Sequence, residues 1–124
     1  MTVQELYAEI GGNYENAKRT LQMDKLIAKF ILKFLDEKSC EKLMAASAEG
    51  DEVSIFEGAH ALKGVCANLG LDDLSSWAGV VAEAYRPGKP HTMDPATRDD
   101  ILARIKQDYD RAIAGIQQFA SENQ

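Results

Sequence analysis

His60 is one of two histidines in the chain, and its neighbours make it suited to accepting a charged group. Lys63 follows three residues later and Gly64 four residues later. On a helix, these spacings place both residues on the same surface as the imidazole. The lysine supplies a positive charge near the ring, and the glycine removes side-chain bulk at a cost of about 1 kcal/mol in helix stability. An exposed imidazole with an open approach and an adjacent cation is suited to receiving a phosphoryl group from a partner protein.

The segment 51–69 is the helix expected to carry this histidine. At about 100° per residue, its apolar residues fall on a single stripe. On the same wheel His60 lies about 140° from Ile55, so we expect the imidazole to face solvent. Phe56 and Ala67 lie on the histidine's side of the helix, and we expect them to contact a docked partner. The expected core stripe comprises Ile55, Ala59, Leu62, Cys66 and Leu69.

Start and stop residues divide the rest of the chain into further helices. Glycines at 11–12, 50 and 70 are placed to end helices, and Asp94-Pro95 is placed to begin the last one. The sequence contains no runs of alternating β-branched residues, which would indicate strands. The residues expected to cap helix N-termini are Thr2, Asn13, Asp51, Asp72 and Asp94.

The strongest amphipathic pattern begins at Asp24 and weakens over residues 36–39, where we expect a kink or a break. Lys25, Lys29 and Lys33 lie on its outer face, where they would either steer an acidic partner or form an ordinary solvated surface. Apolar residues recurring at helical spacing in this region are Leu26, Ile27, Phe30, Ile31, Phe34, Leu35, Leu43, Met44 and Ala48.

These patterns predict an all-α fold, namely an up-down-up-down four-helix bundle with short N-terminal helices packed against it. We expect one domain over residues 1–124. Within it, residues 1–22 would form the short helices, 24–120 the bundle and 121–124 a frayed tail.

Composition excludes several other classes of protein. The chain has 14 basic and 20 acidic residues, a net charge of −6, which argues against binding to a nucleic-acid backbone. No apolar run approaches the roughly 20 residues of a membrane helix, and no signal peptide is evident. Cys40 and Cys66 lack CxxC spacing, which favours free thiols and a cytoplasmic location. We expect a monomer, since no coiled-coil heptads occur, and the initiating Met1 favours a free-standing protein.

The run from His60 to Gly70, HALKGVCANLG, resembles the H-x-L-K-G-x-x-x-N-x-G signature of histidine-containing phosphotransfer (HPt) domains. The resemblance extends to the expected helix order over most of the chain. Val65 and Cys66 stand where the family often has smaller residues, which leaves the chemistry unaffected.

The resemblance implies a carrier of a multistep two-component phosphorelay, without kinase activity or a bound cofactor. His60 would be phosphorylated on a ring nitrogen, most simply Nε2, and Lys63 would stabilise the phosphoryl charge. Gly64 would admit the partner's aspartyl-phosphate loop, and Asn68 would help to position local polar groups. The implied partners are a hybrid histidine kinase and a response-regulator receiver domain, which would supply the aspartate and a divalent metal.

Other interpretations of these residues remain open from the sequence. The same surface would serve a helical adaptor that binds a receiver or another signalling protein without carrying phosphate. Glu57 and His60 have the E-x-x-H spacing of di-iron bundles, but such sites need two of these motifs pointing inward, and we expect no metal site. His91 lies in a Pro/Gly loop and is expected to be solvated, and Trp77 is expected in the core.

Overall fold

A computed structural model describes residues 1–122 of the chain, and all regular structure in this range is helical. This confirms the predicted all-α fold class. The helices are α1 (Val3–Ile10), α2 (Tyr14–Leu21), α3 (Asp24–Lys33), the 3-10 turn η1 (Phe34–Asp36), α4 (Ser39–Glu49), α5 (Glu52–Asn68), α6 (Asp72–Ala84) and α7 (Pro95–Glu122).

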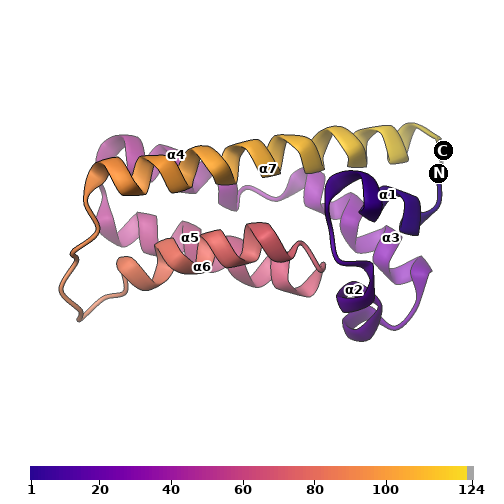
Figure 1. The fold of residues 1–124 in the computed structure, drawn as a ribbon, viewed down its shortest axis with the longest axis horizontal. Coiled ribbons are helices and arrows are strands. Elements are labelled where there is room, and N and C mark those ends of the chain that lie inside the picture. The colour runs from indigo at the N-terminus through magenta and orange to yellow at the C-terminus, as the bar shows by residue number, and fades with distance from the viewer. Residues whose placement is uncertain (123–124) are drawn as a thin grey trace.

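The chain runs along the long axis of the molecule in alternating directions through α4, α5, α6 and α7 (Figure 1). α5 packs between α4 and α6, and α7 packs against α6 and α4. α1, α2 and α3 lie at the opposite end of the molecule from the α6–α7 loop, with α1 packed against α7. This end therefore contains the two short helices expected there together with α3.

Capping side chains begin most helices as the sequence predicts. Thr2 forms a full capping box with Glu5, and Asn13 accepts from the Asn16 amide at 3.0 Å. Asp51 and Asp94 cap α5 and α7 in the same way. The prediction that Asp72 caps α6 is wrong. Leu71 holds the cap position.

Asp72 instead joins α6 to the N-terminal region. It is the first residue of α6, and its Oδ2 accepts hydrogen bonds from Asn13 Nδ2 at 2.9 Å and Asn16 Nδ2 at 2.7 Å. A carboxylate in the first turn also interacts favourably with the helix dipole. The side chain that was expected to make a local cap therefore makes a tertiary contact between α2 and α6.

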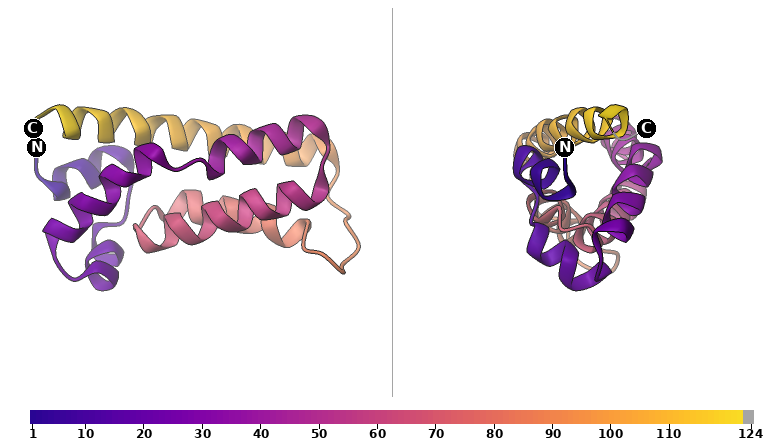
Figure 2. Two further views of the ribbon diagram at one scale, coloured as in Figure 1. Left: turned by 180° about the vertical axis from the view of Figure 1, so that it is seen from behind. Right: turned by 90° about the vertical axis from the view of Figure 1, so that its right-hand side faces the viewer.

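The weak stretch at 36–39 does interrupt the helix, as predicted. η1 tightens the end of α3, and Glu37 leaves helical geometry before α4 begins at Ser39. Glu37 Oε1 accepts from the Ser39 amide at 3.0 Å, which satisfies a backbone donor at the start of α4. Viewed from behind, α3 and α4 follow one another along one side of the molecule, joined by this irregular link (Figure 2).

Two residues of the expected apolar pattern are exposed to solvent. Phe30 is 37% exposed and Ala48 is exposed, whereas Ala46 takes the buried position in α4. Trp77 is half-buried rather than in the core, and its indole lies under the Arg104 guanidinium at 4.9 Å. The rings of Phe30 and Trp77 are large enough to contact the core with one edge while the other side remains in solvent.

Residues 121 and 122, which were expected to begin a frayed tail, are instead the last two residues of α7. α7 remains helical through Glu122, whose carboxylate binds the Met1 ammonium at 2.9 Å. This ion pair brings the start of the chain to the end of α7, as Figure 1 also shows. The last two residues of the predicted tail, 123–124, lie outside the described residues.

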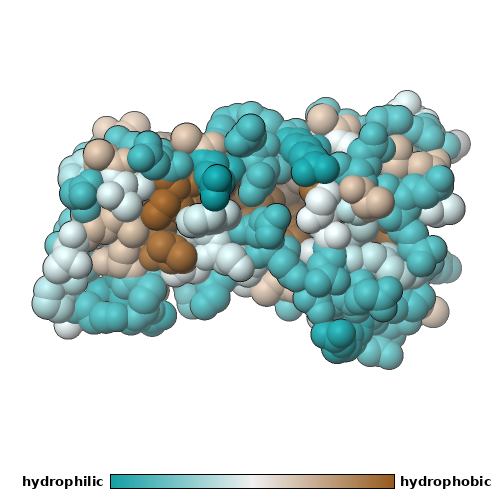
Figure 3. Space-filling model, in the orientation of Figure 1, coloured by the Kyte–Doolittle hydropathy of each residue, from teal (hydrophilic) through white to brown (hydrophobic). Residues whose placement is uncertain are grey.

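Both cysteines are buried free thiols in the core. Burial raises the pKa of Cys40 to about 11 and that of Cys66 to about 12, because the thiolate loses its hydration. The surface in Figure 3 is predominantly hydrophilic, with apolar atoms mainly in a furrow between α6 and α7. Over the described part of the chain, no helix is both long and apolar enough to cross a membrane.

Candidate functional site

α5 presents His60 on the outside of the bundle. The predicted stripe of the helix, from Ile55 to Leu69, is buried between α4 and α6. His60 is exposed, as its angle on the helical wheel predicts. Asp51 fixes the start of the helix, since its Oδ1 accepts from the Ser54 amide at 3.2 Å and its Oδ2 from the Ser54 hydroxyl at 2.9 Å.

The two glycines inside α5 have different surroundings. A Cβ on Gly58 would lie 3.0 Å from the Leu43 backbone, so this glycine lets α4 approach closely. A Cβ on Gly64 would meet nothing within 4 Å. Gly64 therefore has no packing role among the described residues, and its effect is to leave the surface beside His60 bare.

The ring of Phe56 lies against the imidazole. The two ring centroids are 5.4 Å apart and the planes differ by 16°, which is a stacked arrangement. The Arg86 guanidinium lies over the same Phe56 ring at 5.6 Å. Phe56 is half-buried and packs against His60, so it is less available to a partner than the sequence alone indicates.

Lys63 extends along α6 on the other side of the helix. The Ser75 hydroxyl donates to the Lys63 carbonyl at 3.0 Å, and the lysine stem passes over Gly79. No ion pair within the described residues involves the Lys63 ammonium. Glu83, which borders the same surface depression, binds Lys89 and Arg86 instead, and these two cations lower the pKa of its carboxyl to about 2.

Ala67 and Asn68 continue the exposed face of α5 beyond Gly64. Ala67 borders a polar depression shared with α2 and the start of α6. Asn68 lies on the rim of an apolar groove, and among the described residues its side chain has no hydrogen-bond partner. The expected role of Asn68 in positioning local polar groups therefore stays a prediction.

Comparison with protein families places this arrangement among known proteins. A family model described as "Hpt domain" matches residues 15–115, which is most of the chain. The chain belongs to the Hpt domain family. No curated protein and no solved structure matched it. Membership assigns this Hpt domain a phosphotransfer role in phosphorelay signalling.

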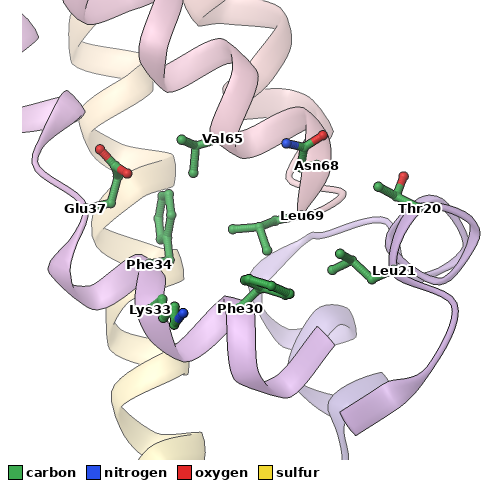
Figure 4. A pocket seen from close by; sticks show the side chains of 9 residues that line it. All are labelled: Thr20, Leu21, Phe30, Lys33, Phe34, Glu37, Val65, Asn68 and Leu69. Carbon is green, nitrogen blue, oxygen red and sulfur yellow. The ribbon is translucent and has the colours of Figure 1, made fainter. Parts of the chain in front are cut away.

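The Hpt domain has a groove next to its histidine helix that the sequence did not reveal. It has a volume of about 430 Å³ and lies between α5, α2 and the α3–η1 segment (Figure 4). The side chains of Phe30, Phe34 and Leu69 project into it, with Lys33 and Glu37 at its edges. Its other lining residues are Thr20, Leu21, Val65 and Asn68.

Phe30 forms an exposed apolar edge of this groove, and two lysines flank it. Lys29 Nζ lies 5.8 Å and Lys33 Nζ 5.3 Å from the centroid of the Phe30 ring. Lys25, Lys29 and Lys33 are all exposed, as predicted. The Hpt domain therefore carries a positive rim on the α3 side of α5, although its net charge is −6.

His91 is exposed, as expected, but its ring also makes contacts that the sequence did not indicate. Its Nδ1 lies 3.1 Å from Glu52 Oε1 and its Nε2 lies 3.2 Å from the Arg86 carbonyl. The ring also packs on Tyr85 at 5.4 Å. His91 thus fastens the α6–α7 loop to the first turn of the histidine helix, a contact that sequence spacing alone could not reveal.

Within residues 1–122, no group of three or more His, Cys, Asp or Glu side chains is arranged to hold a metal ion. His60 and Glu57, the pair with E-x-x-H spacing, are both exposed on α5.

Proposed function

We propose that this Hpt domain carries a phosphoryl group on His60 and exchanges it with the aspartate of a receiver domain. The observation that supports this most is the combination around one exposed imidazole. Phe56 is stacked on its ring, the Lys63 ammonium forms no ion pair within residues 1–122, and a Cβ on Gly64 would meet nothing within 4 Å. A surface used for binding alone has no need of an oriented imidazole beside an open approach.

In the proposed transfer, a lone pair on His60 Nε2 attacks the phosphorus of an aspartyl phosphate on the receiver. The N–P bond forms as the O–P bond breaks, and the aspartate leaves as a carboxylate. The receiver's divalent metal neutralises the phosphoryl oxygens on its side. Because each protein positions the group and stabilises charge, the same geometry serves transfer in both directions.

Lys63 and Gly64 act at different stages of this reaction. The Lys63 ammonium compensates the charge on the phosphoryl oxygens as they reach His60. Gly64 leaves space for the loops of the receiver that surround its aspartate. A Cβ at this position would meet nothing within 4 Å, so a larger side chain there would extend toward the receiver.

We infer that the receiver docks over the face of α5 from His60 to Asn68 and into the groove beside it. The groove continues this face, and its lining is mainly apolar. Phe30 presents an exposed edge at the groove, and the flanking Lys29 and Lys33 favour an acidic partner surface. A hybrid histidine kinase would reach the same His60 through its own receiver domain.

The assignment of His60 is tested by intact mass after incubation with phosphoramidate. We expect one added phosphoryl group that is lost in mild acid, in the wild type and in His91→Gln, and no addition in His60→Gln. Addition that persists in His60→Gln and disappears in His91→Gln would overturn the assignment. Binding and signalling output that persist in full in His60→Gln would instead identify an adaptor.

The docking surface is tested with Phe30→Asp. We expect slower transfer from a phosphorylated receiver, with phosphoramidate labelling of His60 unchanged, because the substitution removes apolar contact and adds a like charge toward an acidic partner. Ala103→Asp adds the same charge on the exposed side of α7, a helix that does not contact α5 in the described structure. Equal transfer by the two variants would place docking elsewhere.

A further inference from the structure

Lys63 is held by α6 at two points. The Ser75 hydroxyl donates a hydrogen bond of 3.0 Å to the Lys63 carbonyl. One turn further along α6, the lysine stem crosses Gly79. A Cβ built on Gly79 would lie 3.5 Å from Lys63 Cδ, 3.6 Å from Cε and 3.9 Å from Cγ. Residues four apart share a helix face, so Ser75 and Gly79 form one seat beneath this lysine.

The backbone does not explain a glycine at position 79. It lies inside α6, where glycine costs about 1 kcal/mol relative to alanine. Its φ is not in the left-handed region, unlike that of Gly11, Gly50, Gly70 and Gly88. The side chain that a larger residue would carry beyond Cβ would point into the space that the Lys63 stem occupies. The absence of a side chain is therefore what this position contributes.

We propose that Gly79 is a positioning residue for phosphoryl transfer, because its bare surface on α6 seats the Lys63 stem and thereby sets where the ammonium lies relative to His60. The inference rests on the proposed function of His60. It adds that the position of the charge is determined by α6, a helix that carries none of the residues of the histidine signature.

The charges around this seat are consistent with the inference. Glu83 lies one turn beyond Gly79 and borders the same depression as Lys63. Its carboxylate is occupied by Lys89 and by Arg86, the latter at 2.9 Å. The carboxylate on this face of α6 is therefore already neutralised by two other cations, and Lys63 lies on the helix through its methylene groups.

The proposal is tested by a series at position 79 measured for transfer from a phosphorylated receiver to His60. A single methyl group would lie at ordinary contact distance from the Lys63 stem, so Gly79→Ala should retain the wild-type rate within about twofold. Gly79→Leu fills the space of the Lys63 stem, so its transfer rate should fall by most of the decrease seen in Lys63→Ala. The double variant Gly79→Leu with Lys63→Ala should be no slower than Lys63→Ala alone, since both act through one group.

A second readout needs no receiver. Phosphohistidine made with phosphoramidate should show the same displaced ³¹P resonance in Gly79→Leu as in Lys63→Ala, whereas Gly79→Ala should match the wild type. For the assay with a receiver, Ser76→Leu is the control. It adds the same bulk at an exposed position of α6 and shows how much an added side chain obstructs the partner. If Gly79→Leu fails to fold, as judged by circular dichroism, Gly79→Gln replaces it with a more flexible side chain.

The outcomes separate this inference from the proposed function. A wild-type transfer rate and an unchanged ³¹P resonance in both Gly79→Leu and Gly79→Gln would overturn the proposal that Gly79 positions Lys63. A double variant whose loss of transfer rate equals the sum of the losses of Gly79→Leu and Lys63→Ala, in free-energy terms, would also overturn the inference. Gly79 would then act independently of the lysine. An absence of phosphorylation at His60 in the wild type, by receiver and by phosphoramidate, would overturn the proposed function itself.

Discussion

The Phe56 ring lies almost parallel to the imidazole of His60, one turn earlier on α5, with 5.4 Å between the ring centroids and 16° between the planes. The Arg86 guanidinium lies over the same phenyl ring. We expect this stack to set the orientation of the imidazole before a partner arrives. In the proposed transfer, Phe56 would act through His60, in addition to any contact with the receiver.

Replacing Phe56 with alanine should slow phosphorylation of His60 by phosphoramidate. An aromatic pair of this kind contributes about 0.5–1.5 kcal/mol, which corresponds to a decrease of about 2- to 10-fold if the stack is needed for the reactive orientation. Phe56→Tyr keeps the ring and should react like the wild type. The rates come from intact mass against time. An unchanged rate in Phe56→Ala would show that the stack does not orient the imidazole.

Substitution of Gly64 should separate access by a protein from access by a small molecule. Gly64→Gln should keep phosphoramidate labelling near the wild-type rate but should slow transfer from a receiver by about 10-fold or more, because its side chain projects into the space the receiver must occupy. The free energy of unfolding should rise by up to about 1 kcal/mol, as glycine is unfavourable inside a helix. Urea denaturation and the two labelling rates check this. Equal slowing with both donors would contradict it.

The contacts of His91 should make stability depend on pH. Glu52 and the Arg86 carbonyl are both acceptors, so both ring nitrogens can bond at once only in the imidazolium form. The Glu52 carboxylate, followed by the Arg86 carbonyl, raises the pKa of His91 above its ordinary value of 6.5. The charged form is thus favoured in the folded state. Its contribution to stability is complete below that ordinary value and is lost as the pH rises through the raised pKa.

Urea denaturation of the wild type and of His91→Gln across this pH range measures that contribution. The difference in the free energy of unfolding should be larger at pH 5.5 than at pH 8.5. A difference that is constant with pH, or that grows toward pH 8.5, would show that the ring is held by packing on Tyr85 rather than by its charge.

Asn13 should contribute more to stability than its place in a short turn suggests. Asn13→Ala removes the cap of α2 and the hydrogen bond to Asp72. We expect a loss of about 1–2 kcal/mol in the free energy of unfolding. Asn16→Ala removes a hydrogen bond to the same carboxylate without removing a cap, and should cost less. Urea denaturation of both variants makes the comparison, and a greater loss in Asn16→Ala would contradict the assigned role of Asn13.

Helix periodicity and capping chemistry were sufficient to predict much of this molecule. The core stripe of α5, the exposure of His60 and the break before α4 all follow from local spacing, which a helix converts directly into direction. Asp72 shows where that reasoning fails. Its position suits a cap, but two asparagines from a distant segment compete for its carboxylate. Local sequence patterns do not indicate hydrogen bonds between residues that are far apart in the chain.

The parts of the site that could not be predicted are those contributed by other helices. Ser75 and Gly79 affect Lys63 only because α6 packs against α5, and Phe30 borders the groove only because α3 ends beside α5. Nothing in the local pattern of these residues indicates function. A glycine inside a predicted helix was the one available signal at position 79, and it becomes informative only when its neighbour is known.

The burial of both cysteine thiols has a practical consequence for experiments that follow this protein in solution. The chain contains two cysteines, and both are covered and hold their protons at neutral pH. Because the thiolate is the reactive form, neither competes well for a thiol-directed reagent in the folded state. A cysteine introduced at an exposed position such as Ala103 would therefore take up a fluorophore selectively. A fluorophore on that single introduced cysteine would report partner binding in real time, and the two natural cysteines need not be replaced first.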